Sequence, residues 1–194
     1  KGTRLRPFTS VLPKPLMPIG SRPVLEHLLK WLRRNGIREV FITTGYLGHL
    51  IRSFCGDGRQ WDLEISYTHE PEPLGTVGPL RLLEGRLDET FLVLNGDVLT
   101  DLNLRAFTSA HRKLGGMLTI ATTTRLTRMD YGVIDADGGD RITAFREKPA
   151  FSNRVSMGAY CLEPEVLDFI PPDMAFGVDD LVHRLMEENA PVHI

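Results

Sequence analysis

Hydrophobic and polar positions alternate along the chain in two different periods. Apolar side chains between residues 24 and 32 recur at helical spacing, so they predict a helix with one buried face. The β-branched and aromatic run 39–43 that follows predicts a buried strand. The same two patterns recur further on, and they predict helices at 47–54, 77–83, 104–114, 164–170 and 179–189 and strands at 63–67, 91–94, 117–124, 155–162 and 192–194.

The order of these segments indicates the fold class. Strands that alternate with helices predict an α/β protein built on a sheet with a parallel core. One exception lies late in the chain, where Val133-Ile134 and 142–145 flank the turn Asp137-Gly138-Gly139-Asp140. That pattern predicts a β-hairpin, and therefore an antiparallel addition to the sheet.

Composition narrows the function classes. The chain has 194 residues and a net charge of -2, which argues against a strongly basic nucleic-acid surface. For this reason we expect no nucleic-acid partner. We also expect no membrane association, because no apolar run approaches the length of a membrane span and the N-terminal segment has no signal-peptide core. Cys55 and Cys161 show neither metal-ligand spacing nor a disulfide framework, so we expect reduced thiols and a cytoplasmic protein.

Two basic segments near the start of the chain each have two interpretations. Lys1–Pro7 is either a frayed basic tail or an anion cradle, in which glycine admits phosphate to the backbone and Arg4 supplies a bidentate fork. Lys14 lies between two prolines. The segment is either a proline-rich linker or a stiff support that presents the Lys14 charge to an anion.

The segment Asn95-Gly96-Asp97 is also ambiguous. Asn-Gly between apolar runs is a strong hairpin signal. Alternatively, Asp97 stands at the carboxyl end of a central strand, where open α/β sheets bind ligands and where a carboxylate suits Mg²⁺ and substrate phosphates. The unbroken run 91–94 favours the central strand.

Three further features carry weaker signals. Glu147-Lys148-Pro149 is a solvated ion pair or a polar site at a strand end, and 74–78 is a loop-to-helix turn or a close approach to a flat ligand. The histidines are scattered, so the sequence predicts no histidine metal site and no Ser-His-Asp or Cys-His catalytic group.

The order of the motifs is more specific than any one of them. Gly-Thr-Arg-Leu-x-Pro, Lys-Pro, Glu-x-x-Pro-Leu-Gly-Thr-x-Gly, Asn-Gly-Asp, Tyr-Gly-Val-Ile, Glu-Lys-Pro and Met-Gly-x-Tyr follow one another as in the sugar-phosphate nucleotidylyltransferases, which the chain resembles over almost its whole length. The pattern is most similar to guanylyltransferases that act on mannose 1-phosphate or a heptose 1-phosphate. Glucose-1-phosphate thymidylyl- and uridylyltransferases are the nearest alternative.

This resemblance implies a fold, a reaction and a site. The fold is a Rossmann-like three-layer α/β/α sandwich with a mixed, mainly parallel central sheet. The reaction joins an NTP to a sugar 1-phosphate with Mg²⁺ and releases pyrophosphate. The implied nucleotide-binding residues are Gly2, Thr3, Arg4, Lys14, Glu70, Gly75 and Thr76. The implied sugar-phosphate contacts are Gly132, Glu147, Lys148 and Tyr160. The implied catalytic residues are Arg4, Lys14, Asp97 and Lys148, with Asp97 as the metal ligand.

The chain departs from the family pattern at both ends. We expect residues 1–194 to form a single nucleotidyltransferase domain that lacks its first strand and its C-terminal end, where the family places a second metal carboxylate. Asp179 and Asp180 fit the start of a helix better than a metal site. A catalytically silent regulatory homologue that binds nucleotide-sugar therefore stays open, although intact Arg4, Lys14 and Asp97 argue against it. Family members often form homo-oligomers, and no residue here selects a symmetry.

Glu70 lies in the loop that the family uses to bind the nucleobase, so it bears on which base the protein prefers. Guanine presents two adjacent donors on its Watson–Crick edge, and a carboxylate is an acceptor that matches both. Uracil and thymine present one donor between acceptors, which suits glutamine better. The sequence therefore predicts GTP as the nucleotide, while a solvated loop acid is the alternative role for Glu70.

Overall fold

The computed structural model describes residues 7–194, which form two compact units. The first unit combines the chain up to Ile120 with Gly158–Ile194, and the second is Ala121–Met157.

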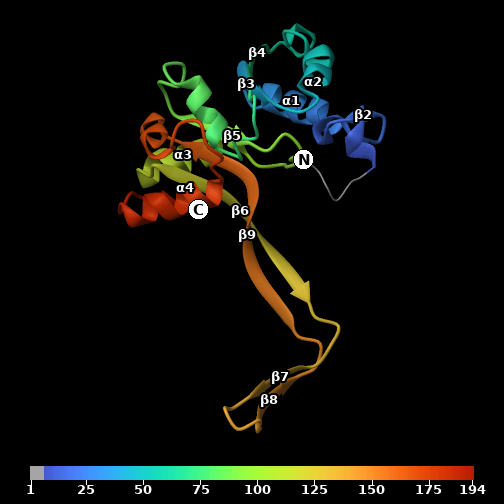
Figure 1. Ribbon diagram of the computed structural model, residues 1–194, viewed down its shortest axis with the longest axis vertical. Helices are drawn as coiled ribbons and strands as arrows, with labels where there is room; N and C mark the ends of the chain where they lie inside the picture. Colours follow the sequence, from blue (N-terminus) through green and yellow to red (C-terminus); the bar gives the residue numbers. More distant parts are fainter. Residues whose placement is uncertain (1–6) are drawn as a thin grey trace. The chain divides into compact units, whose positions relative to one another are not determined.

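Figure 1 shows the helices and strands along the chain. The α-helices are α1 (Val24–Arg34), α2 (Gly48–Cys55), α3 (Leu104–Leu114) and α4 (Val178–Glu187). The 3-10 helices are Phe8–Ser10, Lys14–Leu16, Arg59–Trp61, Gly78–Leu83 and Pro164–Phe169. The strands are β1 (Pro18–Ile19), β2 (Arg22–Pro23), β3 (Glu39–Thr44), β4 (Glu64–His69), β5 (Phe91–Leu94), β6 (Leu118–Arg128), β7 (Val133–Ala136), β8 (Ile142–Arg146), β9 (Ala150–Leu162) and β10 (Val192–His193).

The predicted amphipathic helices are confirmed, and their ends have physical causes. In α1 the apolar residues predicted to face the core are buried, and Glu26 pairs with Lys30 one turn later on the opposite face. In α3 the Asn103 side chain accepts a hydrogen bond from the Ala106 N–H at 3.0 Å, which caps the first turn. Gly115 ends α3 in the left-handed region with φ 63°.

The sheets are mixed, so the structure shows a mixed α/β protein. β3 and β4 form a parallel pair in register from Glu39↔Glu64 to Thr44↔His69. A four-stranded sheet has the order β10-β6-β9-β5, in which β10 runs parallel to β6 and β5 runs antiparallel to β9. The four residues of β5 are half-buried, and apolar side chains cover both faces of the strand, as the apolar run predicts: Leu92 and Leu94 pack on one apolar cluster, and Phe91 and Val93 pack on another. β5 nevertheless stands at the edge of this described sheet.

Two clusters of apolar side chains form the core of the first unit. One joins α1 and α2 to β3 and β4 and includes Leu29, Ile51 and Ile65. The other joins β6 and β9 to α4 and includes Leu162 and Leu181, neither of which is exposed. Each fully buried leucine stabilises the fold by roughly 1.5–3 kcal/mol relative to an exposed one.

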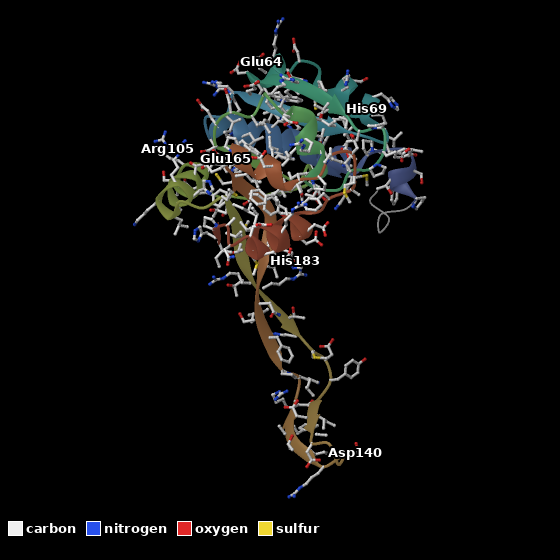
Figure 2. The ribbon with its side chains drawn as sticks, turned by 60° about the vertical axis from the view of Figure 1, so that its left-hand side comes forward. Glu64, His69, Arg105, Asp140, Glu165 and His183 are labelled. Atoms are coloured by element: carbon white, nitrogen blue, oxygen red, sulfur yellow. The ribbon has the colours of Figure 1, made fainter. Side chains whose placement is uncertain are left out.

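The second unit contains the predicted hairpin. β7 and β8 pair antiparallel, and the turn between them carries Asp140, labelled in Figure 2. Asp137 holds the turn, since its carboxylate accepts a hydrogen bond from the Gly139 N–H at 2.9 Å. Across the strands, Arg146 binds Asp135 with both guanidinium nitrogens at 2.7 and 3.0 Å.

Some predicted elements differ in type or length. The segments predicted as helices at 77–83 and 164–170 are 3-10 helices, each with proline in its first turn. β6 and β9 are longer than predicted, and the residues by which they exceed the prediction, 125–128 and 150–154, are exposed. Within residues 7–194, no helix has the length and apolar character needed to cross a membrane.

Candidate active site

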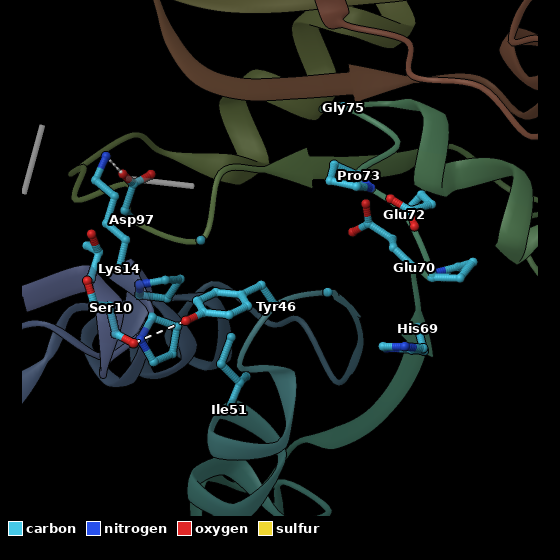
Figure 3. A pocket seen from close by; sticks show the side chains of 16 residues that line it. Ser10, Lys14, Tyr46, Ile51, His69, Glu70, Glu72, Pro73, Gly75 and Asp97 are labelled. Carbon is cyan, nitrogen blue, oxygen red and sulfur yellow. Dashed lines mark hydrogen bonds and ion pairs between the residues drawn. The ribbon is translucent and has the colours of Figure 1, made fainter. Parts of the chain in front are cut away.

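The first unit contains a cavity of about 930 Å³, shown in Figure 3. Five segments line it: residues 9–15, the loop after β3, Ile51 of α2, the loop after β4 and the turn after β5. β3 and β4 are parallel, so both release the chain at the same edge of the sheet, which is where open α/β sheets bind ligands. Figure 2 marks the two ends of β4 by Glu64 and His69, and the cavity lies at the His69 end.

Lys14 and Asp97 form an ion pair at one side of the cavity. The prolines on either side of Lys14 hold it in the short helix Lys14–Leu16, and Pro15 packs on the Asn95–Asp97 turn. The contact is close, because a Cβ at position 96 would lie 3.1 Å from the Pro15 ring. The Lys14 side chain is 49% exposed and that of Asp97 is 27% exposed, so water screens the pair. The two residues are thus in contact, and the phosphate-binding and metal-binding roles predicted for them stay predictions.

The turn that carries Asp97 is a strand end and not a hairpin. β5 pairs with β9, and α3 follows the turn, so the hairpin interpretation of Asn95-Gly96 is wrong. The Val98 N–H donates to the Asn95 carbonyl at 3.1 Å, which closes a tight turn. Asp97 therefore stands just beyond the carboxyl end of a strand, although β5 is an edge strand of the described sheet.

Gly158 supports this turn from β9, and the sequence prediction did not include it. The Asn95 N–H donates to the Gly158 carbonyl at 2.9 Å. Gly158 has φ +71°, and a Cβ there would lie 2.6 Å from the Asn95 amide nitrogen. Glycine is the residue that tolerates both the left-handed backbone and this close approach. The Met-Gly-x-Tyr motif signalled the position, but its contact with Asn95 depends on strand pairing across a long stretch of sequence.

Glu70 lies across the cavity from Asp97, in the loop that follows β4. Its N–H donates to the Thr44 carbonyl at 2.8 Å, which extends the β3–β4 ladder by one residue. Its carboxylate is half-buried and accepts the Leu74 N–H at 3.1 Å. A carboxylate has about four acceptor positions, so this bond leaves capacity for a ligand.

Gly75 lines the same cavity. Glycine is required at this position by a close contact inside the protein. It has φ +81°, and a Cβ there would lie 2.6 Å from the Phe176 carbonyl oxygen. The Phe176 N–H donates to the Leu74 carbonyl at 2.9 Å, so this segment packs directly on the loop. The neighbouring Thr76 is exposed. The prediction that Gly75 and Thr76 bind nucleotide stays a prediction.

The other predicted residues are not among the described residues that line this cavity. Gly132, Glu147 and Lys148 belong to the second unit. Gly132 and Glu147 are close together, since a Cβ on Gly132 would lie 3.3 Å from a Glu147 carboxylate oxygen. Tyr160 is in the first unit and only 4% exposed, within the core that packs on α4. The predicted triphosphate loop residues fall outside the described residues, and these are Gly2, Thr3 and Arg4.

The cavity also contains residues that sequence reasoning missed. Tyr46 follows the carboxyl end of β3, and its hydroxyl donates to the Ser10 carbonyl at 3.1 Å. His69 ends β4 and lines the opposite side. The signal for both was available, because the carboxyl ends of two parallel strands meet at one edge of a sheet.

Neither cysteine offers a nucleophile. Burial raises the pKa of Cys55 to about 11 and that of Cys161 to about 12, so both thiols are protonated at neutral pH.

Asp180 accepts the Gly177 N–H at 2.8 Å and caps α4, which confirms the expected position of the acidic pair at a helix start. Over residues 7–194, no three histidine, cysteine or acidic side chains converge as a metal-binding group.

Comparison with known proteins shows the family of the chain. The model of the family described as nucleotidyl transferase matches residues 1–191, so the chain belongs to that family. It is 35% identical to a UTP–glucose-1-phosphate uridylyltransferase of Synechocystis sp., over 100% of this chain and 55% of the relative. It is 37% identical to a mannose-1-phosphate guanyltransferase of Debaryomyces hansenii, over 87% of this chain and 49% of the relative. The chain thus spans about half the length of the curated relatives it matches.

A solved structure shares the fold. The crystal structure of HddC from Yersinia pseudotuberculosis has a TM-score of 0.72 and 22% sequence identity, and the match covers 94% of this chain and 80% of that one. The resemblance of the motifs to nucleotidylyltransferases is therefore confirmed at the level of family and fold.

Proposed function

We propose that the chain carries the nucleotide site of a sugar-1-phosphate nucleotidylyltransferase, which makes an NDP-sugar and pyrophosphate. The observation that carries this proposal is the ion pair of Lys14 and Asp97 on one side of the cavity, with Glu70 across from it (Figure 3). A cation for phosphates, a carboxylate for a metal ion and an acceptor for a base are thereby arranged along one cavity.

The reaction needs positioning and charge neutralisation more than acid–base chemistry. An oxygen of the sugar phosphate attacks the α-phosphorus of the NTP, and the bond from that phosphorus to the bridging oxygen breaks as pyrophosphate leaves. A phosphate oxygen is already nucleophilic at neutral pH, so no general base is required. Lys14 and Arg4 neutralise charge on the phosphates, which is consistent with a cavity lined by a lysine and without a buried catalytic cysteine.

Asp97 fits the role of a Mg²⁺ ligand. Mg²⁺ prefers oxygen ligands and is usually held by one or two protein carboxylates together with substrate phosphates. The Asp97 carboxylate faces the cavity with its charge balanced by Lys14. When bound, the metal ion would shield the triphosphate and stabilise the leaving pyrophosphate. Lys14 would then exchange its carboxylate partner for a phosphate oxygen.

The sugar phosphate is assigned to the second unit. Glu147 accepts from sugar hydroxyls and Lys148 binds the phosphate, while Gly132 leaves room for the Phe145 ring first and for the Glu147 carboxylate beside it. Tyr160 is the weakest of these candidates, because its side chain is buried in the core. For the fold as a whole, we extend the mixed sheets seen here to a three-layer sandwich with a mainly parallel central sheet.

GTP is the proposed nucleotide, with a mannose- or heptose-type sugar 1-phosphate. Glu70 supports it, since a half-buried carboxylate with spare acceptor capacity matches the paired donors of guanine. The second candidate is UTP with glucose 1-phosphate, which is favoured by the match to the Synechocystis relative over the whole chain.

The test is pyrophosphate release by the protein as encoded in its gene, with GTP, UTP, dTTP and ATP at equal concentration, each with mannose, heptose and glucose 1-phosphates. We expect GTP to be preferred, and Glu70→Gln to reduce that preference on the order of 10- to 100-fold, since an unpaired donor costs a few kcal/mol.

The matched control is Glu64→Gln at the opposite end of β4, which should leave the preference unchanged. A wild-type preference for UTP would replace the guanylyl assignment with the uridylyl one. Nucleotide binding without pyrophosphate release under any pairing would favour a silent regulatory protein.

A further inference from the structure

Tyr46 is an aromatic side chain left open to solvent inside the cavity. It is 61% exposed, although large aromatic rings usually bury most of their surface. Of the described residues that line the cavity, it is the one with a phenyl-type ring. An exposed ring in a cavity of this size, about 930 Å³, offers a flat apolar face to a ligand.

The local backbone holds this ring in a fixed place. Tyr46 stands in the turn between β3 and α2, where Leu47 adopts φ 59°. Gly48 packs closely on Thr44, since a Cβ on Gly48 would touch the Thr44 side chain. At its other end, the Tyr46 hydroxyl donates to the Ser10 carbonyl at 3.1 Å. A ring tied at both ends loses little conformational entropy when a ligand binds.

The position of the ring relates it to the two charged groups of the cavity. Figure 3 shows Tyr46 between the Lys14–Asp97 pair and Glu70. A nucleotide with its phosphates at Lys14 and its base edge at Glu70 would extend across the cavity that Tyr46 lines. Every nucleobase has a flat π-face, and stacking on an aromatic side chain is favourable for all of them.

We infer that Tyr46 is a stacking platform for the base of the bound nucleoside triphosphate. This inference rests on the proposed function and assigns the two contacts to different tasks. Tyr46 supplies affinity that is independent of base identity, and Glu70 supplies the choice between bases. The Ser10 contact orients the ring and does not itself touch the nucleotide.

The test measures binding without sugar phosphate, using GTP, UTP and inorganic tripolyphosphate as probes in isothermal titration calorimetry. Tyr46→Ala should weaken GTP and UTP roughly 5- to 100-fold, from the energy of one base–aromatic stack, and leave tripolyphosphate unchanged. Tyr46→Phe keeps the ring and should bind both nucleotides within about threefold of the wild type, an allowance for one lost neutral hydrogen bond. Tyr131→Ala removes an exposed tyrosine of the second unit and serves as the matched control.

A spectroscopic readout separates stacking from a change in loop shape. 2-Aminopurine riboside triphosphate loses fluorescence when its base stacks, so it should be quenched on binding to the wild type and to Tyr46→Phe. At saturation it should stay bright on Tyr46→Leu, which keeps an apolar side chain without a ring.

Several results would overturn the inference: equal weakening of tripolyphosphate and GTP by Tyr46→Ala, unchanged nucleotide affinity, or quenching that survives in Tyr46→Leu. Failure of the wild type to bind any nucleotide would instead refute the proposed function.

Discussion

Replacing Asp97 by asparagine tests the metal site, because the substitution keeps the shape of the side chain and removes its charge. In the structure Asp97 has a charged partner, Lys14, and the two side chains are 27% and 49% exposed. A solvent-screened ion pair of this kind contributes at most about 1 kcal/mol to stability. Loss of a carboxylate that holds a metal ion against substrate phosphates should cost more, on the order of 100-fold in rate or about 2.7 kcal/mol.

The loss of rate and the loss of stability expected for Asp97→Asn therefore differ in size and can be compared. Asp97→Asn should reduce pyrophosphate release at least 100-fold at saturating Mg²⁺, while urea unfolding changes the free energy of unfolding by about 1 kcal/mol or less. Asp101→Asn changes an exposed carboxylate further along the same segment and should alter neither. A loss of rate that merely follows a loss of stability would show that Asp97 is a structural turn residue.

Lys14 permits a sharper second comparison, a double-mutant cycle. If Asp97 only orients Lys14, Asp97→Asn should cost nothing once Lys14 has been replaced by alanine. If Asp97 holds a metal ion, Asp97→Asn should still cost roughly 100-fold in the Lys14→Ala background. The rate is measured in both backgrounds across a range of Mg²⁺ concentrations. Disappearance of the Asp97 effect in the Lys14→Ala background would refute the metal assignment.

Two further predictions concern Gly158, which supports the Asp97 turn, and the two buried thiols. Gly158→Ala should lower the rate at least tenfold and leave nucleotide Kd within about threefold, because a Cβ 2.6 Å from Asn95 displaces the turn that carries Asp97; rate and Kd measured in parallel check it, and a wild-type rate would contradict it. The buried thiols of Cys55 and Cys161, with pKa values raised to about 11 and about 12, should resist iodoacetamide at pH 8 in the native protein and react on unfolding in urea, followed by mass spectrometry. Labelling of the native protein at pH 8 would contradict this prediction. Burial raises the pKa of both thiols above the ordinary 9.0, so the contribution of the two protonated thiols to stability is present below pH 9 and falls as pH rises through the range from 9 to about 12.

Local sequence signals predicted most elements of the first unit correctly. The apolar face of α1 and the glycine that ends α3 depend on neighbours within a few residues, and both are as expected. The pairing of strands depends on contacts between distant segments, so the antiparallel contact of β5 with β9 was not predictable from local pattern. The same limit explains the wrong hairpin alternative for Asn95-Gly96, whose turn chemistry is identical in both cases.

Glycines show where the limit matters for function. A glycine in a motif indicates that something approaches the backbone closely, but the sequence does not say what. At Gly75 the approaching group is the Phe176 carbonyl, and at Gly158 it is the Asn95 side chain. Both glycines therefore shape the cavity by permitting contacts inside the protein. In this chain the glycines of both motifs therefore contribute to the packing that places Glu70 and Asp97.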